Sequence, residues 1–335
     1  MSPQTSSDHE IPQLEIISEI EYSTFRIGAF RAALKLQLWK KIAAGEDTAA
    51  EMAAHEGWDL AGARTLLDAM VALKLLSREG ERYSLVLESS TYLIPGKPTY
   101  KGDLLLAEFQ WDRNGQLSET IRSGKRPLQD DATTPEMAPL WLADYSRRWA
   151  HPEIYFEAEK KFWKSLQIEA RNGLQVLDMA CGPAPRSMEL ARQNSGVHLT
   201  WLDWEGVLVT SMKVAGELGI AGQVTCVPGD LWSAKFNPNS FDVTYLGDVT
   251  HFFNAEANTR LFRKIYEATT PGGMIVINSV ARKEKEAEVW DGLWLYVVTA
   301  TGGLYDFKEY QTMLERAGFT NIRDFDLGPI RAEKR

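Results

Sequence analysis

The pattern of hydrophobic and polar residues changes near residue 174, where short apolar runs begin to alternate with amphipathic stretches. Such alternation predicts parallel βαβ units and a doubly wound sheet. Ligands of such sheets bind at the carboxyl ends of the strands. The predicted strands are LQVLDMA, HLTWLD, VTCVPGD, FDVTYLGD and GMIVINSV, and the predicted helices are RSMELARQN, EGVLVTSMKVAGELG and AEANTRLFRKIYEAT.

The first part of the chain has mainly helical spacing. Residues 14–44 predict one or two amphipathic helices, whose apolar positions are Phe25, Ala29, Ala33, Leu36, Trp39 and Ala43. Thr48 and Glu51 form a capping box that opens a short helix. A third helix is expected over about 60–76, and a small hairpin over 77–86. Helices followed by such a hairpin predict a mainly α winged-helix domain.

A winged-helix domain can read DNA or mediate dimerisation. A DNA-reading helix needs basic and amide side chains that meet phosphates and base edges. The candidate helix, AGARTLLDAMVALK, has one Arg, one Lys and one Asp, and the chain has a net charge of -9 and a pI near 5.3. Dimerisation is therefore the favoured hypothesis, and no nucleic-acid partner is expected.

The predicted organisation has a disordered tail, a winged-helix dimerisation domain, linker helices and a doubly wound domain, at residues 1–12, 13–120, 121–170 and 171–335. The N-terminus has neither the basic start nor the apolar stretch of a secretory signal. The longest apolar runs, such as 293–300, fall short of the roughly 20 residues that a membrane span needs. A cytoplasmic protein with no membrane partner is expected.

Acidic residues close three successive predicted strands. Asp178 precedes small residues and a helix start, whose free N–H groups can face a ligand. Asp203 follows Gly182 by 21 residues, at a strand end where a carboxylate can accept hydrogen bonds from a ribose diol. Asp230 ends the third strand, beside two apolar residues that can flank a base. Unpaired carboxylates near a sheet edge cost desolvation energy, so a nucleoside ligand explains all three better than packing does.

Cysteine and histidine positions narrow the possible chemistry. The two cysteines, Cys181 and Cys226, lie in neither a CxxC motif nor a Cys/His cluster, so no disulfide framework or metal site is expected. Of the five histidines, only His251 follows a strand end in the expected ligand crevice. The other four, His9, His55, His151 and His198, have no assigned role.

The segment FDVTYLGDVTHFFNAEANTRLFRKIYEATTPGGMIVINSV (241–280) contains a strand, a histidine, an amphipathic helix and PGG before a strand. It resembles class I S-adenosylmethionine (SAM) dependent methyltransferases, and more narrowly the small-molecule O-methyltransferases of the plant caffeate type and of bacterial secondary metabolism. The first hundred residues resemble that family's winged-helix dimerisation domain, and 302–319 its penultimate helix. The resemblance implies a Rossmann-like α/β fold, SAM as cofactor, no metal, a homodimer, and methyl transfer to a hydroxyl of a small, largely apolar aromatic or polyketide-like metabolite.

The resemblance also implies roles for individual residues. Residues 178–184 match the glycine-rich SAM loop, Asp203 the ribose-binding acid, Asp230 the adenine-side acid and His251 the general base. The implied cofactor-binding residues are Asp178, Ala180, Gly182, Asp203, Trp204, Asp230, Leu231 and Gly247. The implied acceptor-binding residues are Tyr145, Trp149, Phe252, Trp290, Trp294 and Tyr305.

Several positions depart from the family pattern. Ala180 and Ala184 stand where glycines are usual. The positions that orient the base in plant-type members hold Phe252, Gly247, Asn278 and Tyr305. These departures leave C- or N-methylation, or a non-methylating rearrangement, open as alternatives. Two further alternatives are a winged-helix regulator, which the acidic charge disfavours, and an NAD-dependent dehydrogenase, which the missing GxGxxG motif disfavours.

Overall fold

The computed structural model of the chain describes residues 14–97, 99–102, 106, 113–126, 153–168, 173–279, 286–325 and 329–335. The chain divides into two compact units, residues 1–106 and 107–335. The predicted boundary at residue 120 falls inside helix α8 (Leu117–Ser123), whereas the division into units lies before this helix. The predicted tail, 1–12, lies outside the described residues. Within the described part, no helix combines the length and apolar character needed to cross a membrane.

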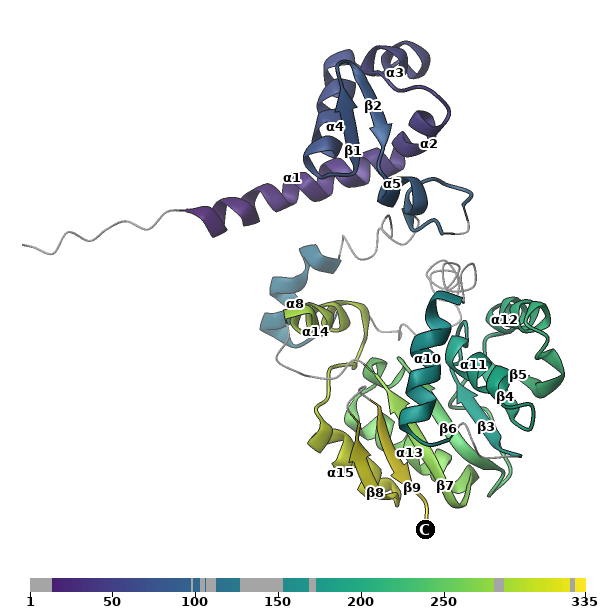
Figure 1. Cartoon of the computed structure of the whole chain (residues 1–335). Helices are drawn as coiled ribbons and strands as arrows, with labels where there is room; N and C mark the ends of the chain where they lie inside the picture. The colour runs from purple at the N-terminus through teal and green to yellow at the C-terminus, as the bar shows by residue number, and fades with distance from the viewer. Residues whose placement is uncertain are drawn as a thin grey trace, which may run out of the picture. The chain divides into compact units, whose positions relative to one another are not determined.

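The described elements of the first unit follow the predicted order of helices and hairpin (Figure 1). They are α1 (Glu15–Lys35), α2 (Leu38–Ala43), α3 (Ala49–Glu56), α4 (Leu60–Ala72), β1 (Leu76–Glu79), β2 (Arg82–Leu85) and α5 (Leu87–Tyr92). The capping box is confirmed, because the Glu51 N–H donates to Thr48 Oγ1 at 3.2 Å and the Thr48 N–H donates to Glu51 Oε2 at 3.1 Å. Helix α4 ends before residue 76 because the chain turns at Lys74 (φ 61), which lets Leu76 pair with Leu85.

The core of the first unit lies between these helices and the hairpin, around Trp39, Leu67, Met70 and Tyr83. The predicted apolar stripe of α1 enters this core only at its C-terminal end. Phe25 is 68% exposed. Ile16, Ile17 and Ile20 in the first half of α1 are also exposed, as is Leu14 directly before the helix. Within the described residues, the first half of α1 therefore presents an apolar surface.

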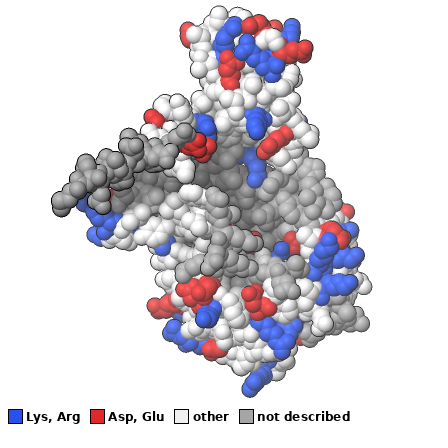
Figure 2. All heavy atoms as spheres, turned by 60° about the vertical axis from the view of Figure 1, so that its left-hand side comes forward, with Lys and Arg blue, Asp and Glu red and all other residues white. Residues whose placement is uncertain are grey.

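The arginines of the hairpin are paired with acidic side chains. Arg82 Nη1 lies 2.7 Å from Asp47 Oδ1, and Arg78 Nη1 lies 2.8 Å from Asp68 Oδ1. Figure 2 shows acidic and basic side chains close together on the visible face. In the described part of the first unit, these arginines do not form the concentrated basic face that phosphate binding needs.

The described part of the second unit is built on a seven-stranded sheet with the order β5-β4-β3-β6-β7-β9-β8. The strands are β3 (Gln175–Met179), β4 (His198–Asp203), β5 (Val224–Pro228), β6 (Phe241–Gly247), β7 (Thr269–Asn278), β8 (Thr320–Asp324) and β9 (Ile330–Glu333). Strands β3 to β7 run parallel, and β9 pairs antiparallel with β7. The five parallel strands are the predicted ones, so the doubly wound α/β fold is confirmed.

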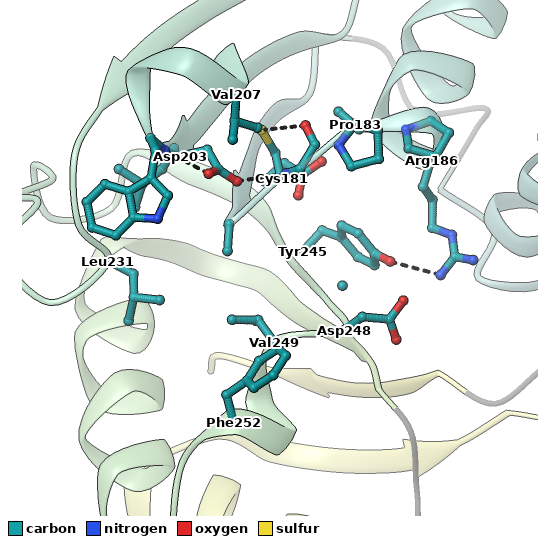
Figure 3. A pocket seen from close by; sticks show the side chains of 18 of the residues that line it. Cys181, Pro183, Arg186, Asp203, Val207, Leu231, Tyr245, Asp248, Val249 and Phe252 are labelled. Carbon is teal, nitrogen blue, oxygen red and sulfur yellow. Dashed lines mark hydrogen bonds between the residues drawn. The ribbon is translucent and has the colours of Figure 1, made fainter. Parts of the chain in front are cut away.

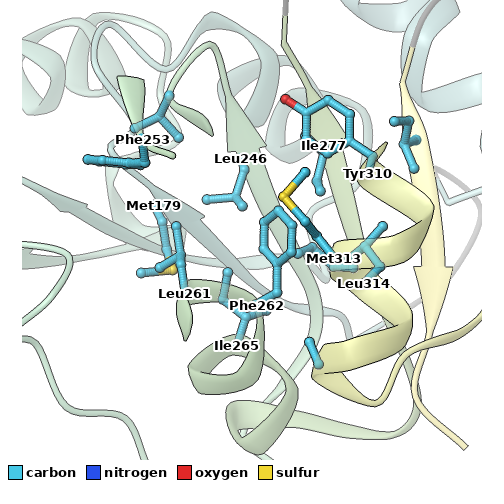
Figure 4. Packing of buried hydrophobic residues seen from close by; sticks show 14 of the residues in the cluster. Met179, Leu246, Phe253, Leu261, Phe262, Ile265, Ile277, Tyr310, Met313 and Leu314 are labelled. Carbon is cyan, nitrogen blue, oxygen red and sulfur yellow. The ribbon is translucent and has the colours of Figure 1, made fainter. Parts of the chain in front are cut away.

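Helices pack on both faces of this sheet (Figure 1). They are α10 (Glu153–Ser165), α11 (Pro185–Gln193), α12 (Glu205–Glu217), α13 (Ala255–Ala268) and α15 (Phe307–Ala317). The second unit also contains α14 (Glu286–Val298) and the short 3-10 turns η2 (Ala221–Gln223) and η3 (Thr250–Phe252). Successive strand residues alternate between two cores, so Val176 belongs to the cluster containing α10 to α12 and Leu177 to the cluster containing α13 and α15. Figure 4 shows the second cluster, where Phe262 and Met313 lie among strand residues.

Candidate active site

A cavity of about 340 Å³ lies at the carboxyl ends of β3, β4 and β6 (Figure 3). This is the edge of the sheet that the strand pattern predicts for a ligand. All eight predicted cofactor-binding residues line it, namely Asp178, Ala180, Gly182, Asp203, Trp204, Asp230, Leu231 and Gly247. They converge because parallel strands end at the same edge of a sheet.

The loop after β3 is held against Asp203 by backbone hydrogen bonds. The Gly182 N–H donates to Asp203 Oδ2 at 2.8 Å, and the Trp204 N–H donates to Asp203 Oδ1 at 2.7 Å. Burial raises the pKa of the Asp203 carboxyl to about 6, although both hydrogen bonds oppose that rise. The loop is left-handed at Ala180 (φ 55), Gly182 (φ 53) and Ala184 (φ 50). A residue with a Cβ costs about 1–2 kcal/mol in this conformation, which explains why glycines are usual there.

Asp178 is buried at the end of β3. Ser187 Oγ donates to Asp178 Oδ2 at 2.5 Å, and Trp201 Nε1 donates to Ser187 Oγ at 3.0 Å. The other oxygen, Asp178 Oδ1, has no hydrogen-bond partner among the described residues. Burial, with a smaller contribution from the charge of Asp203, raises the pKa of Asp178 to about 7, although the hydrogen bond from Ser187 opposes that rise. A buried carboxylate that lines a cavity with an unused acceptor marks a place for a donor on a ligand.

Asp230 caps the turn that follows β5. Its Oδ1 accepts hydrogen bonds from the Trp232 N–H at 2.5 Å and the Ser233 N–H at 2.9 Å, so the carboxylate is fixed at the cavity. Leu231 is buried and lines the cavity. Trp232 instead packs on Phe253, with ring centroids 4.9 Å apart, and is not among the lining residues. Of the two apolar neighbours of Asp230, only Leu231 is therefore placed to flank a base.

His251 lies in η3, directly after β6, and lines the cavity while being only 4% exposed. Its Nδ1 lies 2.8 Å from Ser279 Oγ, and no carboxylate among the described residues hydrogen-bonds to the ring. Burial lowers the pKa of His251 to about 4. The Gly303 N–H donates to the His251 carbonyl at 2.9 Å, and a Cβ on Gly302 would lie only 2.4 Å from that oxygen. A residue with a side chain at Gly302 would therefore displace His251.

A charged part of the cavity wall was not predicted from the sequence (Figure 3). Arg186, in the first turn of α11, forms an ion pair with Glu159 of α10, and its Nη1 donates to the Tyr245 hydroxyl at 2.8 Å. Asp248 also lines this part of the cavity. Burial raises the pKa of Tyr245 above its usual range, so the phenol keeps its proton. The sequence signal is weak, because an Arg directly after Pro185 is compatible with an ordinary exposed helix start.

Comparison with known proteins gives this geometry a context. Residues 176–273 match the family model described as a methyltransferase domain. The chain is 23% identical to the 3-hydroxy-5-methyl-1-naphthoate 3-O-methyltransferase of Streptomyces sahachiroi over 92% of this chain and 90% of that protein. It is 29% identical to the L-tyrosine C(3)-methyltransferase of Streptomyces lavendulae over 43% of this chain and 41% of that protein. The solved structure of human N-acetylserotonin methyltransferase in complex with SAM has the same fold, with a TM-score of 0.70 and 21% identity over 98% of this chain and 99% of that one.

Together these similarities identify the chain as a SAM-dependent methyltransferase. These similarities favour a methyltransferase over the two alternatives from the sequence, a winged-helix regulator and an NAD-dependent dehydrogenase. The residues of this methyltransferase also fit SAM. Asp203, Asp230 and Leu231 would hold the nucleoside, and the unpartnered Oδ1 of Asp178 suits an ammonium group, which has three N–H donors and no acceptor.

The acceptor-binding residues predicted for the methyltransferase are only partly brought together. Phe252 and Trp294 line the cavity, with ring centroids 6.1 Å apart. Trp290 does not line it and is 62% exposed on α14. Tyr305 is buried outside the lining, because its hydroxyl donates to the Phe253 carbonyl at 2.7 Å. Two further candidates, Tyr145 and Trp149, lie outside the described residues.

Proposed function

We propose that this methyltransferase transfers the methyl group of SAM to a hydroxyl of a small, largely apolar metabolite of aromatic or polyketide-like character. The observation that carries the proposal is the position of His251, which lines the same cavity as Asp178 and Asp203. Phe252 and Trp294 give the cavity an aromatic surface beside it. The similarity to a Streptomyces protein named as a naphthoate 3-O-methyltransferase supports an aromatic hydroxyl as the acceptor.

The residues of the chain mainly supply position. SAM, when bound, supplies a methyl group that its sulfonium has already activated for displacement. Asp203 and Asp230 would fix the nucleoside, and the cavity walls would keep water from the reacting atoms. Displacement needs the nucleophile in line, about 3 Å from the methyl carbon. The backbone of His251 is fixed by the hydrogen bond from the Gly303 N–H to its carbonyl, and we place the His251 side chain against the acceptor oxygen.

The free energy of proton transfer from a phenol to His251 tests the predicted general-base role. Burial lowers the pKa of His251 to about 4, whereas a simple phenol ionises near pH 10. Complete proton transfer from that phenol to the imidazole would be unfavourable by about 6 pKa units, or about 8 kcal/mol. The best acceptor for this cavity is therefore one that does not depend on a strong base.

C-methylation is the second candidate, and the lowered pKa of His251 favours it. An electron-rich ring carbon can attack the methyl group while its hydroxyl keeps its proton, and the C–S electron pair stays on sulfur. The attacked carbon then loses its own, strongly acidic proton to solvent, so the weak basicity of His251 would matter less. The partial similarity to a protein named as an L-tyrosine C(3)-methyltransferase points the same way.

The experiment that tests the proposal uses SAM with a ¹³C-labelled methyl group and a panel of phenols, naphthols and aromatic polyketides. Mass spectrometry should show a product that gains one methyl group, together with an equal amount of S-adenosylhomocysteine (SAH). The ¹³C shift then separates a methoxy group from a ring methyl. A methoxy product supports the proposal, and a ring methyl supports the second candidate. Calorimetric SAH binding without any methylated product across the panel would count against both.

We also propose that the first unit is a winged-helix dimerisation domain. The support is the apolar surface on the first half of α1, where Ile16 is 72% exposed and Phe25 68% exposed. A second copy of the chain would remove that surface from water. Obligate interfaces of this kind usually bury more than about 2,000 Å².

A further inference from the structure

Three hydroxyl groups form a hydrogen-bonded chain that ends at His251. Ser279 Oγ lies 2.8 Å from His251 Nδ1. The Ser279 hydroxyl also hydrogen-bonds with the Tyr310 phenol, and the Tyr310 hydroxyl lies 2.6 Å from Thr250 Oγ1. Thr250 is 0% exposed and Tyr310 1% exposed, so the far end of this hydroxyl chain is closed to bulk water.

The directions of these hydrogen bonds depend on one another, because each hydroxyl has one proton to donate. Among the described residues, the only side-chain hydrogen-bond partner of the Thr250 hydroxyl is Tyr310. Thr250 must therefore donate to Tyr310 if its own proton is to have an acceptor. Tyr310 then donates to Ser279, and Ser279 donates to His251 Nδ1. Every hydroxyl proton is satisfied in this direction, and the proton of the neutral imidazole lies on Nε2.

The opposite direction is less favourable. It would begin with a proton on His251 Nδ1 and end at Thr250, whose buried hydroxyl proton would have no acceptor among the described residues. A buried donor without a partner shifts such an equilibrium by about tenfold or more.

The charge states of the groups involved agree with this direction. Burial alone accounts for the lowered pKa of His251, so the ring is neutral near pH 7. Burial also raises the pKa of Tyr310, with Asp248 and Glu309 adding to the rise, so its phenol keeps the proton that it donates. Because Ser279 occupies Nδ1, Nε2 is the ring nitrogen left for a ligand in the cavity.

We propose that His251 presents Nε2–H to the cavity as a hydrogen-bond donor, and that the acceptor oxygen it contacts is an oxyanion. This inference rests on the proposed methyl transfer to oxygen and names the acceptor class: phenols and enols that are acidic because their hydroxyl is conjugated with a carbonyl. Such an acceptor loses its proton to solvent before it binds. An electron pair of the oxyanion forms the new C–O bond, the C–S bond breaks, and its electron pair stays on sulfur as a neutral thioether. Ser279, Tyr310 and Thr250 are positioning residues for His251.

The tautomer can be read from ¹⁵N NMR of the histidine-labelled protein with SAH bound, the His251 signals being assigned with a His251→Gln variant. We expect Nε2 to carry the proton and Nδ1 to be unprotonated at neutral pH. Ser279→Ala removes the hydroxyl that donates to Nδ1, and it should raise the Nδ1–H population by up to about tenfold. Ser89→Ala is the matched control, because Ser89 is a buried serine whose hydroxyl donates to the Val86 carbonyl at 3.1 Å, outside the hydroxyl chain. A proton on Nδ1 in the unaltered protein, or an unchanged tautomer in folded Ser279→Ala, would overturn the assignment.

The pH dependence of kcat/KM tests whether the acceptor binds as an oxyanion. It is measured for two acceptors that the enzyme methylates and that differ in acidity. If the acceptor binds as an oxyanion, the midpoint of the profile follows the pKa of each acceptor. If His251 were the base, the midpoint would be the same for both acceptors, and the oxyanion acceptor would be refuted. Failure to methylate any acceptor would refute the proposed function and the oxyanion with it, whereas the NMR spectra would still decide the tautomer.

Discussion

Replacing Asp178 with Asn should stabilise the ligand-free protein at pH 8 and weaken its binding of SAH. The pKa of buried Asp178 is raised to about 7, whereas an Asp in the unfolded chain ionises near pH 3.9. Because the folded state holds this proton more tightly, the corresponding stability is fully present below about pH 4 and is lost as the pH rises through about 7. The gap of about 3 pKa units corresponds to about 4 kcal/mol of lost stability at alkaline pH.

Asn has nearly the same shape as Asp and no charge, so the variant should not lose this stability as the pH rises. Its amide oxygen can still accept from Ser187 Oγ, but the NH₂ group then replaces the oxygen that has no partner. We therefore expect the free energy of unfolding at pH 8 to rise by only about 1–3 kcal/mol. SAH affinity should fall about 10- to 100-fold, because a hydrogen bond between a carboxylate and an ammonium group is worth about 1.5–3 kcal/mol.

Urea unfolding between about pH 4 and 8 measures the first effect, and calorimetry measures the second. The advantage of the variant should fall by about 4 kcal/mol between pH 8 and about pH 4, so the variant should be the less stable protein at about pH 4. Asp242→Asn is a suitable control, because Asp242 is another carboxylate with hydrogen-bond donors within the chain, the Gln175 N–H and Thr270 Oγ1, but does not line the cavity. A variant at Asp178 that is less stable at pH 8 and binds SAH normally would refute the reasoning.

Changes elsewhere test other parts of the molecule. Asp203→Ala should lower SAH affinity about 10- to 100-fold with the fold intact, and unchanged calorimetric affinity would contradict its assigned role. His251→Ala should lower kcat by about 10² with nearly unchanged SAH binding, and His251→Gln, which keeps an N–H donor, should recover part of that loss; equal rates would argue against a donor role. Glu159→Ala leaves the half-buried Arg186 without its carboxylate partner and should cost about 1.5–3 kcal/mol in urea unfolding, whereas replacing both residues by apolar ones should restore most of it. Light scattering should give twice the chain mass of 37.7 kDa, and a stable monomer at micromolar concentration would exclude the dimer.

The sheet could be predicted because strands buried on both faces have nearly continuous apolar runs. In β3, residues Val176 to Met179 are all buried, and the same pattern recurs in β6. Strands β8 and β9 were not predicted. The residues of β8 are half-buried or exposed, so no periodicity distinguishes them from a surface loop. Their place in the sheet comes from the antiparallel pairing of β9 with β7, which a short sequence window does not contain.

The acids that line the cavity could be predicted because a strand end fixes both the place and the direction of a side chain. The charged wall could not be predicted. Glu159 and Arg186 are 27 residues apart in sequence and meet only because α10 packs on α11. The role of Ser279 could not be predicted either, because nothing in the sequence around a serine after a strand indicates that it contacts a histidine. For Tyr305, the residue type predicts a buried ring but not that the hydroxyl is already used by the Phe253 carbonyl.

Two carboxylates of one cavity therefore have different physical roles. Glu159 is satisfied within the chain by Arg186, so its loss should lower stability and affect SAH only through the altered wall. Asp178 keeps an unused oxygen in the ligand-free fold, and its burial costs stability that only a ligand donor can offset. A ligand that binds only the folded state adds about 2.7 kcal/mol of stability at a concentration of 100 times its Kd. Stability and SAH affinity should therefore change in opposite directions at Asp178, which distinguishes a carboxylate that serves the ligand from one that serves the fold.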